Sequence, residues 1–521
     1  MSGIDELISI GIEDPEYYAE LLSVTTRDVN GRLLSNEHSC SDIPSIQGVD
    51  LPPAQRLKTL LDVVADISLC QRGNVSATMA CIKPYNDTVE TQIYIAFNHE
   101  NDEAAVSCPE HLQSIFEMLH QVRYRPPATN DSPRVMGKEL EDELVKICGA
   151  ILNYSYDIFN YRVNKRKHKL SQIREYIEQG SAHFLSQRHS TLVEFLEHVD
   201  AIINIVADSQ ATKQLPDVDI RMLLNIYSYW MNHNFLTDDP LANNKPSTLL
   251  DEVDAWLAEG ALSDTCDFTL IGIHIHCLEH DIGFQLRRWA TKIMSFVISA
   301  NRLIMLTQSR RLRHILDGKF TVQVLSSPIT TPYHCDLSSE TMRIAVDTAL
   351  AEAKYDPRDL DEDRTWFMEM LQQRHLVSDV VHDNPTIHAE LVLIIAKAEG
   401  EINNVEPYIG VSKLSCIMCS HFICAFNMVM KQKIATKGFH GKAYTGWFWP
   451  RLPSLDEELR RAFLNLIRQQ IRSDVEQYAE ARRLSDSSVG SGFPKLDLGQ
   501  TKDTISEMIE ARTRRVTEVD F

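Results

Sequence analysis

The chain has 521 residues, and its hydrophobic fraction of 44% and charged fraction of 24% are ordinary globular values that exclude disorder throughout. At roughly 150 residues per domain, the length predicts about three domains. The 52 Lys and Arg against 73 Asp and Glu give a net charge of −21, which argues against a generally basic surface for nucleic acid or membranes but leaves a local basic groove open.

The eleven cysteines are scattered between Cys40 and Cys424 and form no dense disulfide framework. The first six residues are acidic and lack the basic and apolar parts of a signal peptide. No apolar run approaches the ~18 residues of a membrane span, so we expect no membrane partner. These features favour a reduced intracellular protein, cytoplasmic or nuclear, in which neighbouring cysteines indicate a metal site or catalysis.

In chain order, residues 1–50 are predicted to be irregular, and apolar residues at helical spacing predict a helix over 53–72. Two strands follow at 75–82 and 89–97, joined by a Pro-Tyr-Asn-Asp turn that predicts an antiparallel hairpin. Residues 138–314 are typical of successive amphipathic helices and are numerous enough for a helical domain.

Strand-like sequence returns at 320–325, and residues 387–450 alternate helix, strand, helix and strand. A capping-box pattern opens a helix that is expected to end near residue 483. Residues 485–492 have the composition of a flexible linker, and one more helix is expected near the end of the chain.

Two short motifs in this late region carry the chemistry. The first is Ile387-His388-Ala389-Glu390, which opens an apolar helical run, and the second is Ser415-Cys416-Ile417-Met418-Cys419, which follows a buried strand and opens another helix. One imidazole and two thiolates are a standard ligand set for Zn²⁺, and three protein ligands leave the fourth tetrahedral position to water, as in catalytic sites. The positive end of each helix would stabilise the thiolates.

Glu390 follows His388 by two residues and is predicted to face the open metal position without binding the metal. A carboxylate there can take a proton from metal-bound water and deliver it to a leaving nitrogen. This is the H-x-E…C-x-x-C arrangement of zinc deaminases. C-x-x-C alone also occurs in structural zinc sites and redox pairs, but the order of the two motifs favours a deaminase-type site over a noncatalytic relic.

The sequence here resembles the fungal deaminase-like proteins of the cytidine deaminase-like superfamily, a group of nucleic acid or nucleotide deaminases. The resembling residues are Ile387–Leu391, Ile409–Cys419, Gly438–Tyr444 and Trp447–Pro450. The resemblance implies an α/β fold, namely a three-layer α/β/α cytidine deaminase-like sandwich, with zinc held by His388, Cys416 and Cys419 and with Glu390 as proton shuttle. Better-known deaminases carry Pro before the first Cys, whereas this chain has Ser415, which frees a backbone N–H and weakens any transfer of substrate preference.

We expect the deaminase-like domain to be split by a large all-α insertion or additional helical domain. Such sheets begin with a helix and a hairpin, and the sequence just upstream of His388 is helical, so residues 53–97 would supply that unit. The expected parts are an irregular segment (1–50), the first part of the deaminase-like domain (51–125), the helical block (126–318), the zinc-binding part (319–484), and a linker with a C-terminal helix (485–521). The competing arrangement takes 320–325 as the opening strand.

Four further residues are candidates for substrate binding. Asn98 and Glu100 are similar to the Asn-x-Glu-Asn stretch with which free-nucleoside cytidine deaminases hold the ribose, although such residues more often simply form turns. Trp447 and Trp449 are candidates to stack on a heterocycle, with packing in the core as the equal alternative.

Three other features have simpler explanations. Residues 276–280 fit the H-x-x-E-H pattern of inverted zincins, but an ordinary helical surface is favoured. The basic run 161–169 is favoured as a solvated helical face over a nuclear-import or phosphate-binding role. Residues 431–483 contain 11 basic and six acidic residues, and this local excess beside the zinc motif would suit a phosphorylated or polynucleotide substrate.

The sequence therefore favours a zinc-dependent hydrolytic deaminase, in which zinc-bound hydroxide attacks a nucleobase carbon, Glu390 passes the proton and ammonia leaves. The substrate class would be a nucleoside, a nucleotide or a nucleic acid. The alternative is a noncatalytic interaction or scaffold protein whose zinc fold is structural or a relic. Glu390 discriminates between them, because a binding module has no use for a carboxylate beside an open zinc position. The base and the oligomeric state are left open.

Overall fold

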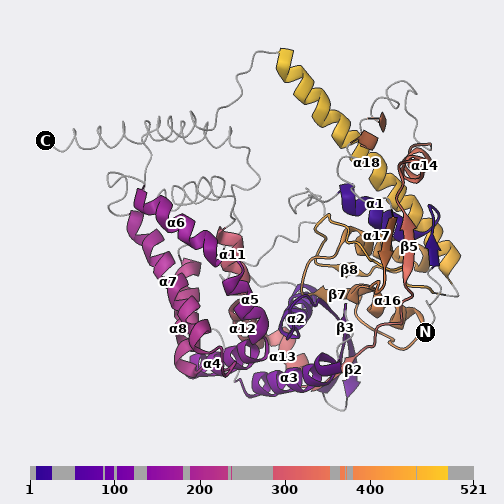
Figure 1. The fold of residues 1–521 in the computed structure, drawn as a ribbon. Helices are drawn as coiled ribbons and strands as arrows, with labels where there is room; N and C mark the ends of the chain where they lie inside the picture. The colour runs from indigo at the N-terminus through magenta and orange to yellow at the C-terminus, as the bar shows by residue number, and fades with distance from the viewer. Residues whose placement is uncertain are drawn as a thin grey trace, which may run out of the picture.

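The computed structural model describes most of the chain, and helices predominate in it (Figure 1). The described residues are 8–25, 53–85, 88–98, 102–122, 138–179, 188–232, 236, 286–351, 364–365, 367–369, 371, 379–452 and 455–490. Among the helices of these residues, none combines the length and the apolarity needed to cross a membrane.

A five-stranded mixed sheet lies beside the two motifs. Its order is β4-β3-β2-β7-β8, and its strands are β2 (Ser76–Tyr85), β3 (Thr88–Phe97), β4 (Lys319–Val324), β7 (Tyr408–Val411) and β8 (Ala435–Thr436). β2 and β3 form the predicted antiparallel hairpin, with Ser76 opposite Phe97. β2 also pairs with β7, where Ala77 lies opposite Val411. The hairpin thus joins the sheet that leads to Cys416, and the division of the chain into a split domain with an insertion stays a prediction.

The strand proposed as the competing opening strand is also in this sheet. β4 runs parallel to β3, with Glu90 opposite Lys319 and Ile95 opposite Val324. The hairpin and the strand at 319–324 are therefore neighbours in one sheet and do not exclude one another.

Helices cover both faces of the sheet. Because side chains alternate along a strand, Ala77, Met79 and Cys81 of β2 join the core beneath two helices that follow the motifs, whereas Ala80 packs on the opposite side. The motif helices are α16 (Ala389–Ala398) and α17 (Ile417–Met430), and the helix on the opposite face is α2 (Pro53–Ile67). The architecture is mixed α/β, with the two motifs on one face.

Close backbone contact fixes α2 against β7. A Cβ atom at Gly410 would lie 2.5 Å from the Leu61 carbonyl oxygen, so only glycine permits this approach. The Asp62 carboxylate accepts from the Val411 backbone N–H at 3.1 Å and from the Tyr408 hydroxyl at 3.0 Å. These contacts hold the end of β7, and with it the start of the loop that leads to Cys416.

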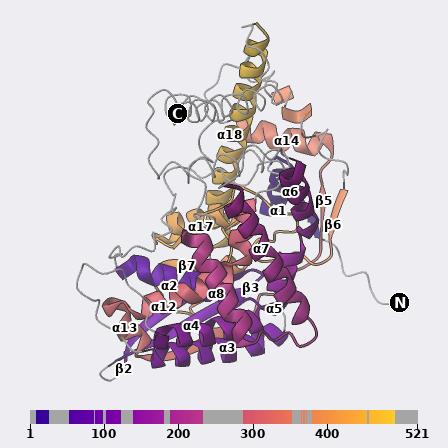
Figure 2. The same ribbon diagram turned by 90° about the vertical axis from the view of Figure 1, so that its left-hand side faces the viewer.

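The helical block continues the core on the α2 face of the sheet. Ile93 and Ile95 of β3 share one apolar cluster with α12, α4 and the helices around them, so the block and the sheet are packed together (Figures 1 and 2). Its described helices are α3 (Asp102–Gln121), α4 (Lys138–Tyr154), α5 (Tyr156–Asn164), α6 (Lys167–Gln179), α7 (Arg188–Asp208), α8 (Asp217–Asn232), α11 (Leu286–Ile293), α12 (Ser295–Thr307) and α13 (Arg310–Leu316).

The N-terminal segment differs from the expectation that residues 1–50 are irregular. A strand, β1 (Ile8–Ile10), pairs in a second sheet of order β1-β5-β6 with β5 (Tyr333–Asp336) and β6 (Asp379–His382). It is followed by a helix, α1 (Pro15–Thr25), in which Tyr17, Tyr18, Leu21 and Leu22 are fully buried. The segment is ordered because its side chains are buried against distant parts of the chain. The sequence did not predict it because a strand as short as β1 gives no periodic signal.

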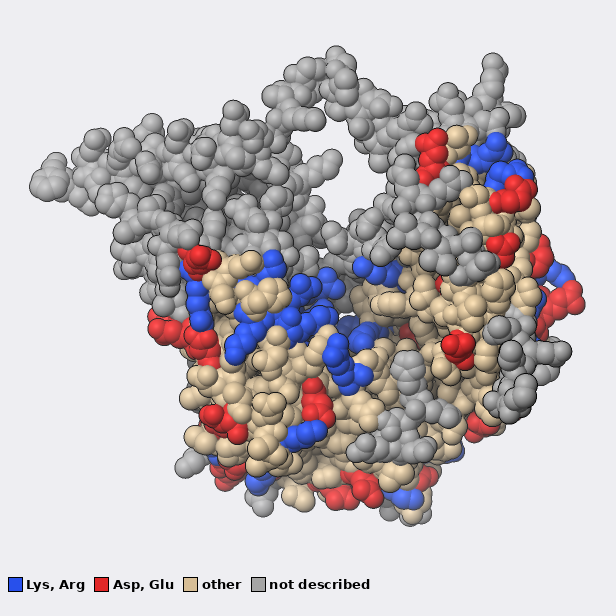
Figure 3. Space-filling model, viewed as in Figure 1, with Lys and Arg blue, Asp and Glu red and all other residues tan. Residues whose placement is uncertain are grey.

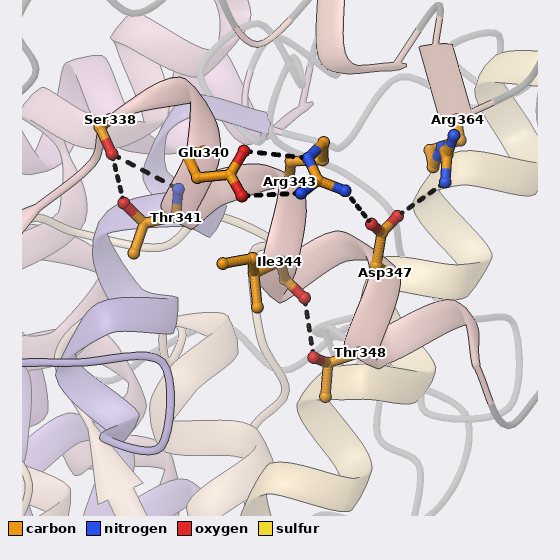
Figure 4. Close-up of polar contacts among 8 residues, drawn as sticks. All are labelled: Ser338, Glu340, Thr341, Arg343, Ile344, Asp347, Thr348 and Arg364. Carbon is orange, nitrogen blue, oxygen red and sulfur yellow. Dashed lines mark hydrogen bonds and ion pairs between the residues drawn. The ribbon is translucent and has the colours of Figure 1, made fainter.

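Helix α14 (Ser339–Leu350) is stabilised along its surface by polar contacts (Figure 4). Ser338 caps its start by accepting from the Thr341 backbone N–H at 3.4 Å. Arg343 pairs with Glu340 at 2.7 Å and with Asp347 at 3.0 Å, at the i,i+3 and i,i+4 spacings that helices favour. Because these pairs are exposed, they contribute only modestly to the stability of the helix.

The last described element is the long helix α18 (Asp456–Gly490), which continues through residues 485–490, where a flexible linker was predicted. Leu459, Phe463, Ile467 and Ile471 recur every four residues and are buried, and the helix packs on α17, α14 and α1. The expected C-terminal helix lies outside the described residues.

Candidate metal centre

The ligands of both motifs lie at helix N-termini on one face of the sheet. His388 is the N-cap residue of α16 and Cys416 is that of α17, and both have extended backbone dihedrals. The Cys416 sulfur accepts from the Cys419 backbone N–H at 3.3 Å, so the thiol takes the place of a usual capping oxygen. The backbone at the start of each helix thus sets the positions of His388 and Cys416.

His388, Cys416 and Cys419 form a buried cluster whose ligand atoms all lie within 4.8 Å of one another. His388 Nδ1 lies 3.4 Å from Cys416 Sγ and 3.2 Å from Cys419 Sγ. Tetrahedral zinc with ordinary bond lengths would separate these nitrogen and sulfur atoms by about 3.5 Å. The donor types and their spacing therefore fit Zn²⁺, with three protein ligands among the described residues.

The electrostatics of the cluster favour a bound cation. Burial opposes ionisation of Cys416, but its contacts with Cys419 and His388 lower the pKa of this thiol well below the usual value. Burial, and then the charge of Cys416, raise the pKa of the Cys419 thiol. Burial works against the His388 imidazolium, but the Cys416 charge raises its pKa overall. A divalent cation would replace these protons and leave both thiols ionised.

Glu390 lies in the first turn of α16, and only 3% of its surface is exposed. Burial raises the pKa of its carboxyl, while the charge of His388 opposes this rise. The shift moves the carboxyl toward the range in which it can both accept and donate a proton near neutral pH. Glu390 thus lies close enough to His388 and Cys416 for their charges to influence its carboxyl.

Asn98 contacts the first motif through the backbone. Its side-chain oxygen accepts from the Ala389 N–H at 2.8 Å, and its own N–H donates to the Val75 carbonyl at 3.0 Å. The end of the β2–β3 hairpin thereby holds the start of α16, between His388 and Glu390. A contact of Asn98 with substrate stays a prediction, and Glu100 lies outside the described residues.

Trp447 and Trp449 are buried, with 0% and 1% of their surfaces exposed, and both contact the Phe463 ring. This burial favours the packing alternative over stacking on a substrate. The Trp447 indole N–H lies beside the Cys419 sulfur and lowers the pKa of that thiol, and it has no conventional hydrogen-bond partner among the described residues. Trp447 therefore contacts a candidate metal ligand, Cys419, and helps to stabilise its ionised form.

The segment from Gly438 to Tyr444 covers the second motif. The Ser415 N–H, which proline would lack, donates to the Gly438 carbonyl at 3.0 Å, and the Ser415 carbonyl accepts from the His440 N–H at 3.1 Å. Tyr444 is 48% exposed, its ring centre lies 6.1 Å from that of His388, and its hydroxyl is 3.3 Å from His440 Nε2. This segment is part of the sequence resemblance, but no role for His440 or Tyr444 was predicted from the sequence.

Residues 387–451 match the OTT_1508-like deaminase family. The matched segment contains His388, Glu390, Cys416 and Cys419 and extends through the 438–444 segment. It supports a deaminase-like assignment for this part of the chain. No curated protein and no solved structure matches the chain.

The second metal motif of the sequence analysis, at 276–280, lies outside the described residues. Within the described part of the chain, the His388 cluster is the one group of three His, Cys, Asp or Glu side chains that meets the distance requirement for a metal.

Proposed function

We propose that this protein is a zinc-dependent hydrolytic deaminase that acts on a nucleobase in a nucleoside, a nucleotide or a nucleic acid. The observation that carries the proposal is the buried Glu390 carboxyl beside a cluster of three metal ligands, within the segment that matches a deaminase family. A closed structural zinc site uses four protein ligands, whereas a catalytic site leaves one position open. A cytidine deaminase-like origin of the fold is part of this proposal.

His388, Cys416 and Cys419 would hold the zinc ion, which supplies a Lewis acid that makes water acidic near neutral pH. Glu390 takes a proton from the attacking water and later delivers it to the departing amine nitrogen. Water oxygen thereby replaces the amino group on the ring carbon, and ammonia leaves. The hydrogen bond from Ala389 to Asn98 keeps the backbone of α16 in place on either side of the reacting groups.

The preference for a heteroaromatic substrate rests on Tyr444. Its exposed ring lies with its centre 6.1 Å from that of the buried His388 imidazole, and an aromatic ring there can stack on a planar base. The His440 imidazole, edge-on to the same ring with centres 5.4 Å apart, braces it.

Metal analysis and ammonia release test the proposal together. The purified chain should carry one zinc ion, which Cys416→Ser with Cys419→Ser should remove. The wild type should release ammonia from a member of a panel of nucleosides, nucleotides, RNA and DNA. Glu390→Gln should keep zinc and slow release by about 10²–10⁴-fold, because proton transfer by a positioned group contributes that much.

Glu399→Gln is the matched control, since Glu399 is the exposed C-cap residue of the same helix. It should leave ammonia release unchanged. If wild type and Glu390→Gln behave alike across the panel, the enzyme proposal fails and the scaffold alternative is favoured.

A further inference from the structure

Basic side chains gather on one face of an otherwise acidic protein. Figure 3 shows Lys and Arg clustered across the middle of the molecule, over α5 and α11 in the view of Figure 1. The exposed members of this basic face come from four segments of the chain, and Arg162 beneath them is half-buried. The basic face is defined here as Arg72, Arg162, Lys165, Arg288, Lys292 and Lys413.

Specific contacts hold the members of the basic face together. The Arg72 guanidinium lies 3.8 Å from the Tyr161 ring centre and donates to the Tyr161 hydroxyl at 3.2 Å. The Lys165 ammonium lies 5.4 Å from the same ring. Arg162 donates to the Lys292 carbonyl at 3.3 Å, which ties α5 to α11. The turn before β2 and two helices of the block thus present their cations side by side.

The basic face adjoins the candidate metal centre. Lys413 lies three residues before Cys416, and its ammonium donates to the Asn74 carbonyl at 3.5 Å, just before β2 begins. The start of β2 and the end of β7 lie at the same end of their strands, since Ala77 pairs with Val411. The loop after β7 leads from this end of the sheet to the start of α17. Lys413 is therefore the link between the cations of the helical block and the metal centre.

The cations of the basic face repel one another. Desolvation, and then the charges of Arg288, Lys165 and other neighbouring cations, lower the pKa of Lys292 to about 8. Desolvation and the charges of Arg162 and Lys165 likewise lower the pKa of Lys413. Lys165, Lys292 and Lys413 make no ion pair with a carboxylate among the described residues. A bound polyanion would offset this repulsion between the cations.

We propose that the basic face binds the phosphate backbone of a single-stranded polynucleotide and directs one of its bases to the metal centre. The direction to the metal centre rests on the proposed function, whereas strand binding does not. The basic face carries six cations, enough to neutralise several phosphates, so a chain of phosphates fits the face better than a free nucleotide. A single strand is favoured because Glu390 is buried and a paired base would have to leave its duplex to reach it. Tyr161 among the cations adds a stacking surface of the kind such strands use.

Fluorescence anisotropy of the full chain with labelled single-stranded RNA and DNA tests this proposal, with the matching duplex, a nucleoside monophosphate and anionic phospholipid vesicles as further arms. Single strands should bind most tightly, with log K falling linearly against log salt. The Lys165→Gln, Lys292→Gln, Lys413→Gln triple variant should make the slope shallower by about 2, because each lost phosphate contact contributes about 0.7.

The matched control is the Lys146→Gln, Lys213→Gln, Lys319→Gln triple variant, which removes the same charge from exposed positions outside the basic face. It should leave the slope unchanged. Equal effects of the two triple variants, or binding of vesicles in preference to strands, would overturn the proposal. Strand binding without ammonia release would support the basic face and contradict the proposed function, and release from free nucleosides without strand binding would do the reverse.

Discussion

The backbone N–H of Ser415 marks the departure of this chain from the proline-containing deaminases that it resembles. That N–H donates to the Gly438 carbonyl, and the Ser415 carbonyl accepts from the His440 N–H. The segment that carries His440 and Tyr444 is thereby anchored to the residue next to Cys416. The departure thus has a structural use in this chain.

Replacing Ser415 by proline should loosen this segment. Ser415→Pro removes the donor to Gly438, a loss of about 0.5–1.5 kcal/mol. Amide hydrogen exchange over residues 438–444, followed by mass spectrometry, should become up to about tenfold faster. Ser415→Ala keeps the N–H and is the control. Equal exchange in the two variants would show that the hydrogen bond does not hold the segment.

The Tyr444 ring should contribute to substrate binding more than to chemistry. Stacking of a base on an aromatic ring is worth about 1–3 kcal/mol, so Tyr444→Ala should raise KM about tenfold or more. kcat should change less, and Tyr444→Phe should keep a KM close to that of the wild type because it retains the ring. Steady-state kinetics on the substrate found in the panel provide the measurement. A Tyr444→Ala variant with the KM of Tyr444→Phe would contradict this role.

At the scale of elements, the parts that depend on local sequence were the ones that could be predicted. His388 and Cys416 are the N-cap residues of their helices, and Cys419 follows Cys416 by one turn, so the spacing of the second motif brings the two thiols together. His388 joins them because α16 packs against α17. The helix α1 escaped prediction. Its place depends on Glu16 and Glu20, whose carboxylates accept from the backbone N–H groups of Trp449 and Gly446, more than 400 residues away. No local pattern encodes such contacts.

The buried Glu16 in α1 should make stability depend on pH. Burial raises the pKa of its carboxyl from the ordinary value of 4.5, so the folded protein binds this proton more tightly than the unfolded chain does. The contribution of Glu16 is therefore fully present below pH 4.5 and is lost as pH rises through the folded-state pKa. Glu16→Gln keeps an acceptor for Trp449 and carries no charge, so it should be more stable than wild type at neutral pH.

Thermal melts from about pH 4 to about pH 8 measure this difference. The gap between Glu16→Gln and wild type should open as the pH rises and close at the acidic end. Glu458→Gln, at an exposed position of α18, is the control and should show no such trend. A gap that widens toward acidic pH would contradict the assigned direction of the shift.

For the whole molecule, composition was a poor guide to where charge lies. The net charge of −21 correctly argues against a uniformly basic surface, yet Lys165 and Lys413, nearly 250 residues apart in sequence, converge on one face. The basic run 161–169 was attributed to a solvated helical face, because nothing local indicates that α5 lies beside the loop before Cys416. The shared core of the sheet and the helical block produces this convergence. Only the tertiary structure could reveal it.

In the proposed function, the helical block supplies cations for the strand, and the N-terminal ends of α16 and α17 supply the metal ligands and Glu390. In the proposed reaction, oxygen from water activated beside Glu390 replaces an amino group of the substrate. Incubation in heavy-oxygen water followed by mass spectrometry of the product measures this replacement directly. The product of the wild-type chain should carry one labelled oxygen in place of the lost amino group, and Glu390→Gln should yield no labelled product. Ammonia release without incorporation of the label, or equal labelling by both chains, would contradict the proposed reaction.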